Sequence, residues 1–324
     1  IFISKSFFYR YEIDALEKSN VFNLLTQLSS ELTKIILEES LLKSSKKIRK
    51  TCLYLINKFD NADLSDLFNK ILISEKEKGL IIYTLKQVFK LKYQPEVVLL
   101  KFFHDNPNWE ISAYSNLING NNKLGLFISS DSEFSFDLSE LFVEQSYKLI
   151  KINSALFKIQ MLDLDELLYF KFIVISNEEH FYRVEKQGDV YNILVEYVNN
   201  GGILLATPWV SWETIEHTSF KKILPVVYLN KFVEGELILL KMNNDKLAPL
   251  ITSYEILKLK KEATLILATA TNNPIISYLK SGKGICIYLN ICQHTCISSI
   301  SSPLKNNREL KTILTNQITN LILD

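Results

Sequence analysis

Four side chains in the second half of the chain have the chemistry of metal ligands: Asp131, Glu178, His180 and His294. Carboxylate oxygens and imidazole nitrogens suit zinc, manganese or iron, so these four could chelate a divalent metal if the fold brought them together. No local ligand spacing supports that reading, and an acidic stretch such as Glu178-Glu179-His180 is more typical of a solvated loop. We therefore expect no bound cofactor.

Two tryptophans three residues apart, Trp209 and Trp212, stand beside Glu213. Aromatic faces backed by a carboxylate can hold a sugar or another flat polar ligand. The competing interpretation is that one or both rings cover a sheet as part of the core, because tryptophan is mostly buried in folded proteins.

All of these residues follow segments with the pattern of short buried strands. Such strands are expected at 125–129, 172–176, 203–207 and 285–290. In an open parallel sheet, ligands collect beyond the carboxyl ends of the strands. We therefore expect a site for a small polar ligand, lined by Asp131, Glu178, His180, Trp209, Trp212, Asn290 and His294.

The pattern around these strands predicts an α/β domain over residues 121–324. Further strands are expected at 147–152, 263–268 and 274–278, and helices at 138–145, 190–199 and 308–323. The pair Gly201-Gly202 ends the helix at 190–199 and leads directly into a strand. Short apolar strands that alternate with helices favour an open, doubly wound, mostly parallel sheet covered on both faces.

The preceding part of the chain follows a different pattern. Its first 119 residues contain one glycine, Gly79, whereas eight of the nine glycines lie from Gly120 onward. Apolar residues recur there at spacings of three and four, which predicts packed helices. The pattern repeats after about thirty residues, where Cys52, Leu55 and Phe59 are followed by Ile82, Leu85 and Phe89. We expect an all-helical repeat domain over residues 1–120, with an irregular helical bundle as the alternative.

The stretch from Ile48 to Phe59, in which Arg49 enters a helix of small and aliphatic residues, resembles a HEAT repeat of the short kind. The resemblance extends over about residues 20–119. A HEAT-like or ARM-like stack of helix pairs presents a long concave face, which implies binding to a protein partner.

Four groups of segments in the second half carry another resemblance. They are Phe172-Ile-Val-Ile-Ser with Tyr197-Val-Asn-Asn-Gly-Gly-Ile-Leu-Leu, Trp212-Glu-Thr with Lys222-Ile-Leu-Pro-Val, Ala263-Thr-Leu-Ile-Leu-Ala-Thr with Asn273-Pro-Ile-Ile, and Gly282-Lys-Gly-Ile-Cys-Ile-Tyr-Leu-Asn. In this order they resemble the class I glutamine amidotransferase-like superfamily over residues 124–324. The resemblance implies a flavodoxin-like α/β fold, and the function is a separate question.

That superfamily attacks glutamine with a cysteine at a tight strand-to-helix turn, activated by a histidine that a carboxylate orients. At the matching place this chain has Thr207-Pro208-Trp209. A hydroxyl has a far higher pKa than a thiol, so Thr207 is a poor candidate nucleophile. His294 matches the histidine, but Thr295-Cys296 replaces the Pro-Glu that would orient it. The resemblance therefore indicates a module without the amidotransferase reaction.

Composition excludes several classes of protein. Lys+Arg 37 against Asp+Glu 36 gives a net charge of +1, which provides no general attraction for nucleic acid. The longest run without charge, from Gly284 to Leu304, is too polar to span a membrane. Four cysteines are too few for a disulfide scaffold, so we expect a cytoplasmic protein, and the start at Ile1 suggests a segment of a longer chain.

These features predict a non-catalytic adaptor or ligand sensor, a pseudoenzyme that joins a helical-repeat arm to a degenerate amidotransferase-like module. The alternative is a hydrolase or amidase in which a metal ion or His294 activates water. A third hypothesis, a sugar-related role, rests on analogy with trehalose-utilisation-like relatives of the same fold and on the two tryptophans.

Overall fold

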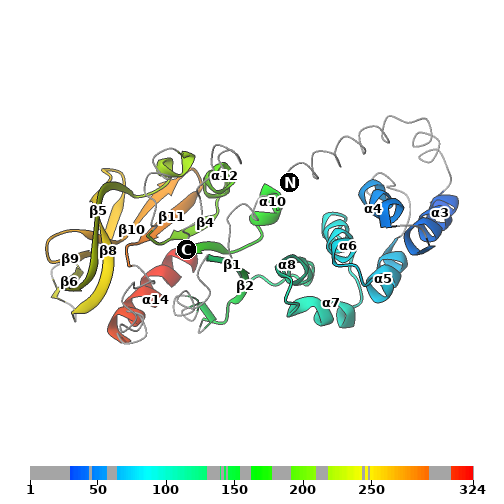
Figure 1. Ribbon diagram of the computed structural model, residues 1–324, viewed down its shortest axis with the longest axis horizontal. Helices are drawn as coiled ribbons and strands as arrows, with labels where there is room; N and C mark the ends of the chain where they lie inside the picture. The colour runs from blue at the N-terminus through cyan, green and yellow to red at the C-terminus, as the bar shows by residue number, and fades with distance from the viewer. Residues whose placement is uncertain are drawn as a thin grey trace. The chain divides into compact units, whose positions relative to one another are not determined.

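The computed structural model describes residues 30–43, 46–56, 64–129, 139, 142–143, 145–153, 162–176, 191–208, 218–242, 245–246, 249–291 and 308–323. The chain divides into two compact units, Ile1–Asn121 and Asn122–Asp324 (Figure 1).

The described part of the first unit consists of helices. They are α3 (Ser30–Lys43), α4 (Lys46–Leu55), α5 (Ser65–Ser74), α6 (Lys78–Lys90), α7 (Val97–His104) and α8 (Trp109–Ile118). Each even-numbered helix packs on the helix before it. In addition, α4, α6 and α8 contact one another in a row, and α3, α5 and α7 form a second row (Figure 1). The helices therefore form two layers.

Apolar residues at helical spacing hold the two layers together. On α6, Leu80, Leu85 and Val88 are fully buried, as the spacing of three and four residues predicts. Ion pairs add links between neighbouring helices: Lys70 binds Glu38 at 2.5 Å, and Arg49 binds Glu75. The burial of apolar side chains provides most of the stability, because ion pairs at partly exposed positions contribute little.

The second unit is built on a nine-stranded sheet. In spatial order its strands are β2 (Lys148–Asn153), β1 (Leu124–Ser129), β3 (Phe172–Ser176), β4 (Ile203–Ala206), β11 (Gly284–Leu289), β10 (Pro274–Ser281), β9 (Thr264–Thr269), β6 (Leu240–Met242) and β7 (Asp245–Lys246). The strands from β2 to β11 are parallel, whereas every neighbouring pair from β11 to β7 is antiparallel. The predicted α/β fold with a mostly parallel sheet is confirmed for the strands from β2 to β11, and the strands added beyond β11 are antiparallel.

The change of direction comes from the short connection between β10 and β11. Only Gly282 and Lys283 lie between these strands, and a two-residue connection can join only antiparallel neighbours. Gly282 has a φ of +59°, which favours glycine at such a turn. A Cβ on Gly284 would lie 2.2 Å from the carbonyl oxygen of Val198, so the hairpin packs tightly against the end of a helix.

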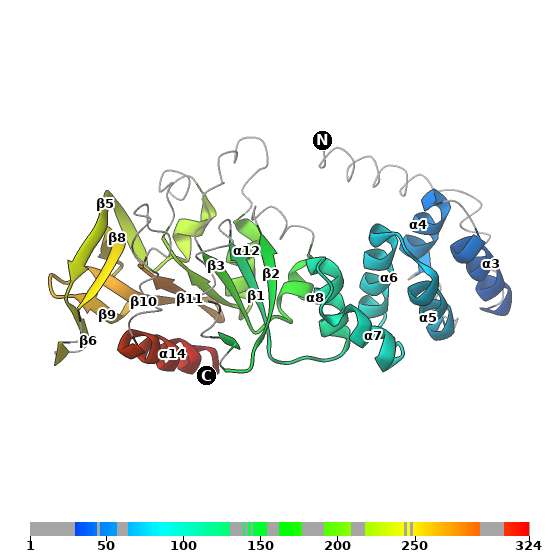
Figure 2. The same cartoon turned by 60° about the horizontal axis from the view of Figure 1, so that its bottom comes forward.

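Helices cover both faces of this sheet. One face carries α12 (Asn192–Asn199), and the opposite face carries α14 (Arg308–Leu323) (Figures 1 and 2). On α14, Leu314, Ile318 and Ile322 are buried in the main core, and the bounds of α14 confirm the helix predicted at 308–323. No helix in the ranges that the structure describes is long and apolar enough to cross a membrane.

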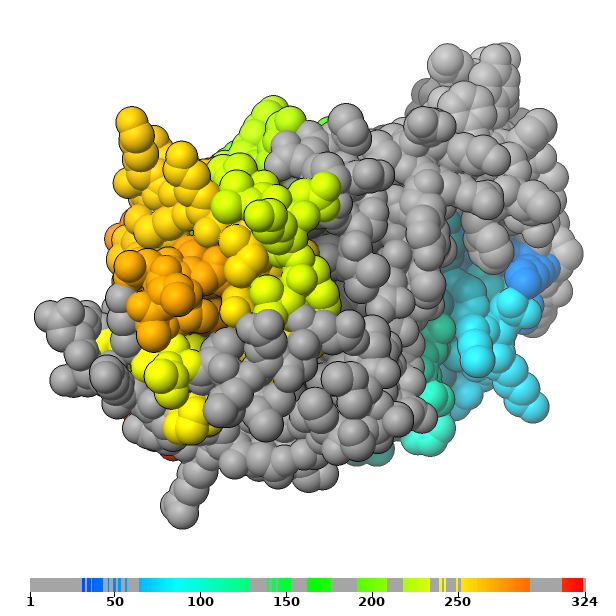
Figure 3. Space-filling model, turned by 60° about the vertical axis from the view of Figure 1, so that its left-hand side comes forward, coloured from blue at the N-terminus to red at the C-terminus, as the bar shows by residue number. Residues whose placement is uncertain are grey.

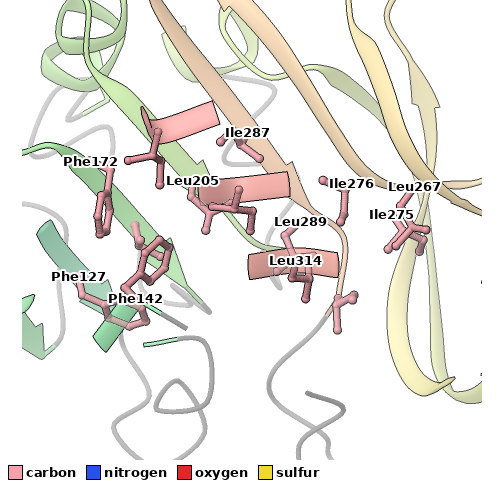
Figure 4. Packing of buried hydrophobic residues seen from close by; sticks show 14 of the residues in the cluster. Phe127, Phe142, Phe172, Leu205, Leu267, Ile275, Ile276, Ile287, Leu289 and Leu314 are labelled. Carbon is pink, nitrogen blue, oxygen red and sulfur yellow. The ribbon is translucent and has the colours of Figure 1, made fainter. Parts of the chain in front are cut away.

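The main core lies between the sheet and α14 (Figure 4). Leu205 of β4 and Ile287 of β11 belong to it, and the rings of Phe142 and Phe172 stack at a centroid distance of 4.4 Å. Phe172, Leu205 and Ile287 lie on strands that are buried on both faces, which explains the continuous apolar sequences of these strands.

A two-stranded ribbon, β5 (Val226–Ile238) with β8 (Leu250–Leu259), lies beside the antiparallel half of the sheet (Figures 1 and 3). Two asparagine side chains attach it. Asn290 accepts a hydrogen bond from the Glu255 amide at 2.9 Å and donates to the Glu255 carbonyl oxygen at 2.8 Å. Asn273 accepts from the Leu257 amide and donates to that same carbonyl oxygen, both at 2.8 Å. We call this pair the asparagine clasp.

We expect Asn290→Ala to lower the free energy of unfolding by about 2–4 kcal/mol, because it leaves buried backbone groups of Glu255 and Pro274 without their partners. Chemical denaturation monitored by circular dichroism measures the loss. Asn200→Ala is the matched control, since Asn200 is exposed and its side chain donates to the Glu196 carbonyl oxygen of its own helix. Equal losses in the two variants would contradict a structural role for the clasp.

Candidate functional site

The structure describes two of the residues that the sequence places at a functional site, Thr207 and Asn290. The others lie outside the described residues: Asp131, Glu178, His180, Trp209, Trp212 and His294. Thr207 and Asn290 follow β4 and β11, which are parallel neighbours, so both lie at the carboxyl edge of the sheet.

Thr207 is fully buried directly after β4. Its backbone N–H donates to the Ile175 carbonyl oxygen at 3.1 Å, so the residue continues the ladder between β3 and β4. A nucleophile must face an open pocket to reach a substrate. A side chain held in the sheet in this way is poorly placed for attack on a substrate.

The Asn290 side chain is occupied by backbone groups. Its Nδ2 donates to the carbonyl oxygens of Glu255 and Pro274, and its Oδ1 accepts from the Glu255 amide. An amide nitrogen carries two hydrogens, so neither is left for a ligand. The binding of a ligand by Asn290 stays a prediction. The hydrogen bonds of Asn290 in the asparagine clasp are observed.

Next to the clasp lies a polar cluster that the sequence reasoning missed. Tyr228 Oη donates to Tyr288 Oη at 2.9 Å, and Tyr288 Oη donates to Glu255 Oε2 at 3.2 Å. The two rings meet edge to face, with centroids 6.1 Å apart. We call Tyr228, Glu255 and Tyr288 the carboxyl–phenol cluster.

Three strands from both sheets position this cluster. Tyr228 lies on β5, Glu255 on β8 and Tyr288 on β11. Ser277 of β10 is directly opposite Tyr288 in the register and is fully buried. The asparagine clasp holds the backbone of Glu255, and the hydrogen bond from Tyr288 holds its carboxyl group.

Burial controls the protonation of the cluster. Glu255 is 6% exposed, and loss of solvation raises its pKa to about 8, although the hydrogen bond from Tyr288 acts in the opposite direction. Burial also raises the pKa values of both tyrosines well above their ordinary value. At neutral pH the cluster is therefore mainly uncharged, with a carboxylic acid that can donate a hydrogen bond.

Cys286 lies two residues before Tyr288, in the middle of β11, and is fully buried. Burial raises the pKa of its thiol to about 12. A thiol that stays protonated inside a strand is not a nucleophile. Cys292 and Cys296 lie outside the described residues. Within the described ranges, no three His, Cys, Asp or Glu side chains are grouped as a metal site requires.

One sequence signal could have revealed Glu255. It is a single acidic residue inside Ile251-Thr-Ser-Tyr-Glu-Ile-Leu, which otherwise has the composition of a buried strand. A charged residue in such a segment is expected to be neutralised or hydrogen-bonded.

No family model matches the chain, and no curated protein matches it. Similar solved structures include a cytoplasmic protein from Salmonella typhimurium LT2, with 17% identity and a TM-score of 0.49, covering 61% of this chain and 99% of that one. A second cytoplasmic protein from Salmonella typhimurium has 17% identity and a TM-score of 0.45, with coverage of 58% and 97%. A ThuA-like protein from Parabacteroides merdae ATCC 43184 has 8% identity and a TM-score of 0.46, with coverage of 62% and 90%. The likeness concerns the fold alone, so function must be argued from the residues.

The raised pKa of Glu255 predicts a pH-dependent stability. Between about pH 4.5 and pH 8 the folded protein keeps the Glu255 proton and the unfolded chain releases it. The free energy of unfolding should therefore fall as pH rises through this window, by about 1 kcal/mol per pH unit. Glu255→Gln keeps an acceptor for Tyr288 without a proton to lose, so denaturation across this range should show a flatter profile.

Glu262→Gln is the matched control, because Glu262 is an exposed glutamate of the same unit. A pH profile that Glu255→Gln leaves as steep as before would show that Glu255 does not hold its proton in the folded state.

Proposed function

We propose that this protein is a non-catalytic adaptor or ligand sensor. In this proposal the first unit is a HEAT-like or ARM-like arm that binds a protein partner. The second unit is a degenerate amidotransferase-like module, a pseudoenzyme that holds a small polar ligand at the carboxyl edge of its sheet.

The observation that carries the proposal is an exposed apolar surface on the helical unit. On α7, Val98 and Phe102 are 77% and 79% exposed and stand one turn apart. We call Val97, Val98 and Phe102 the α7 patch. Contiguous exposed apolar side chains are typical of interaction surfaces, because they provide no stability to the isolated fold.

The packing of the helices supports the repeat interpretation. Stacked helix pairs contact only their neighbours in a solenoid. The rows α4–α6–α8 and α3–α5–α7 have this pattern of contacts. An irregular bundle would instead surround one central core.

The carboxyl–phenol cluster is buried and its hydroxyl groups bond one another and Glu255. It therefore holds the ribbon against the sheet, and the proposed ligand site is at the carboxyl edge of the sheet. The burial of Thr207 and the mid-strand position of Cys286 weigh against a covalent mechanism. The alternative, a hydrolase or amidase, depends on His294 and on its neighbours outside the described residues.

We expect purified protein to release no ammonia from glutamine above the uncatalysed rate. Thr207→Cys should release none either, because position 207 is buried in the sheet rather than placed at an open turn. A coupled ammonia assay measures both proteins. Release by the unaltered protein that His294→Ala abolishes would contradict the proposal and support the hydrolase.

We expect a photocrosslinking amino acid at position 102 to capture a protein in the producing cell. The same amino acid at position 76 should capture none, because Lys76 is exposed in the connection between α5 and α6 and is not part of the α7 patch. Denaturing gels read the adducts. Equal capture at both positions, or none at position 102, would contradict an interaction at the α7 patch.

A further inference from the structure

The ribbon of β5 and β8 has a hydrogen-bond ladder of its own, separate from the ladder of the nine-stranded sheet. Side chains join the two. The asparagine clasp bonds the backbone of β8, and Tyr228 of β5 bonds Tyr288 of β11. Both ends of the ribbon continue into the sheet, through Leu239 to β6 and through residues 260–263 to β9. The ribbon is therefore a tethered element that can leave the sheet without breaking either ladder.

The Glu255 carboxyl group lies where the ribbon meets the sheet. In the docked ribbon Glu255 is 6% exposed, and its Oε2 accepts a hydrogen bond from Tyr288 of β11. No ion pair within the described ranges includes Glu255. Burial without a cation penalises a carboxylate far more than a protonated carboxyl group. The docked arrangement therefore favours the protonated form.

The groups around Glu255 leave it as the one that carries the pH dependence. The titratable neighbours in the cluster are Tyr228 on β5, Cys286 and Tyr288 on β11, and Tyr191 at the start of α12. Burial raises the pKa of the Cys286 thiol and of the two phenols bonded in the cluster, so these groups stay protonated near neutral pH. Strand β10 contributes Ser277, which does not titrate. Lys260 acts on Cys286 and donates to the Lys221 carbonyl oxygen.

We propose that the ribbon is a pH-dependent switch, docked on the sheet while Glu255 carries its proton and open once Glu255 has released that proton to water. Opening also withdraws the Glu255 backbone from Asn290, whose side-chain amide then becomes available at the carboxyl edge of the sheet. The inference goes beyond the proposed function and does not depend on it, because it concerns the attachment of the ribbon.

The direction of the pH dependence follows from the protonation of the two states. Burial raises the pKa of Glu255 to about 8 in the docked ribbon, and the ordinary value of 4.5 applies when the carboxyl group is in water. Between these values opening releases one proton, so the equilibrium constant for opening rises about tenfold per pH unit. Above about pH 8 the docked form has also lost its proton, and the rise ends.

Amide hydrogen exchange of the full chain, followed by NMR, tests the switch. The Glu255 and Leu257 amides bond the clasp, whereas the Thr207 amide bonds Ile175 in the parallel half of the sheet. After correction for intrinsic exchange, the opening constant at the clasped amides should rise about a hundredfold from about pH 5.5 to about pH 7.5. It should exceed the opening constant at Thr207 at each pH, because the sheet stays folded when the ribbon opens.

Glu255→Gln removes the titrating group and keeps an acceptor for Tyr288. The opening constant at Leu257 should then change by less than about threefold over the same pH range. Glu262→Gln is the matched control, because it alters an exposed glutamate of the same unit, and it should keep the hundredfold rise of about two pH units.

Tyr288→Phe is an independent variant for the case in which Glu255→Gln does not fold. It removes the hydrogen bond that lowers the pKa of Glu255, so the rise in opening should continue above pH 8. A rise that still ends at pH 8 in this variant, or one that Glu255→Gln leaves as steep as before, overturns the switch. Equal opening constants at Leu257 and Thr207 also overturn it, because the ribbon would then leave only when the whole unit unfolds.

Discussion

The asparagine clasp is the constraint on which the second unit depends. Strand β8 pairs along one edge with β5, and its other edge faces the nine-stranded sheet at Glu255 and Leu257. Buried backbone groups need hydrogen-bond partners, and no strand supplies them here. The side chains of Asn273 and Asn290 take the place of a strand. They dock the ribbon onto the sheet without extending its ladder.

The clasp also determines the chemistry of the cluster beside it. Asn290 and Tyr288 are two residues apart at the end of β11, so the strand that clamps the Glu255 backbone also provides the phenol that meets the Glu255 carboxyl. Docking of the ribbon onto the sheet places the Glu255 carboxyl group among buried residues, and this burial raises its pKa.

The spacing of apolar residues along the chain was sufficient to predict individual helices and strands. The period of apolar residues indicates a helix at 308–323, and α14 has these bounds.

The ribbon of β5 and β8 was not predicted. These strands pair with register shifts, which interrupt the alternation of apolar and polar side chains along each strand. The role of Glu255 was not predicted, because a charged residue within a strand is normally expected to face solvent. Its buried position becomes evident only when its partners on other strands are known. Of the predicted site, the described residues include only Thr207 and Asn290.

On the helical unit, some apolar side chains of α7 are buried and others are exposed to solvent. Stacking in two rows already buries the residues that hold α7 in place, such as Leu100 and Phe103. Val98 and Phe102 add nothing to that stacking, and exposed apolar groups promote indiscriminate association. The stability of the helical unit therefore comes from its two buried rows. The α7 patch is the part of this unit that the proposed contact with a partner would use.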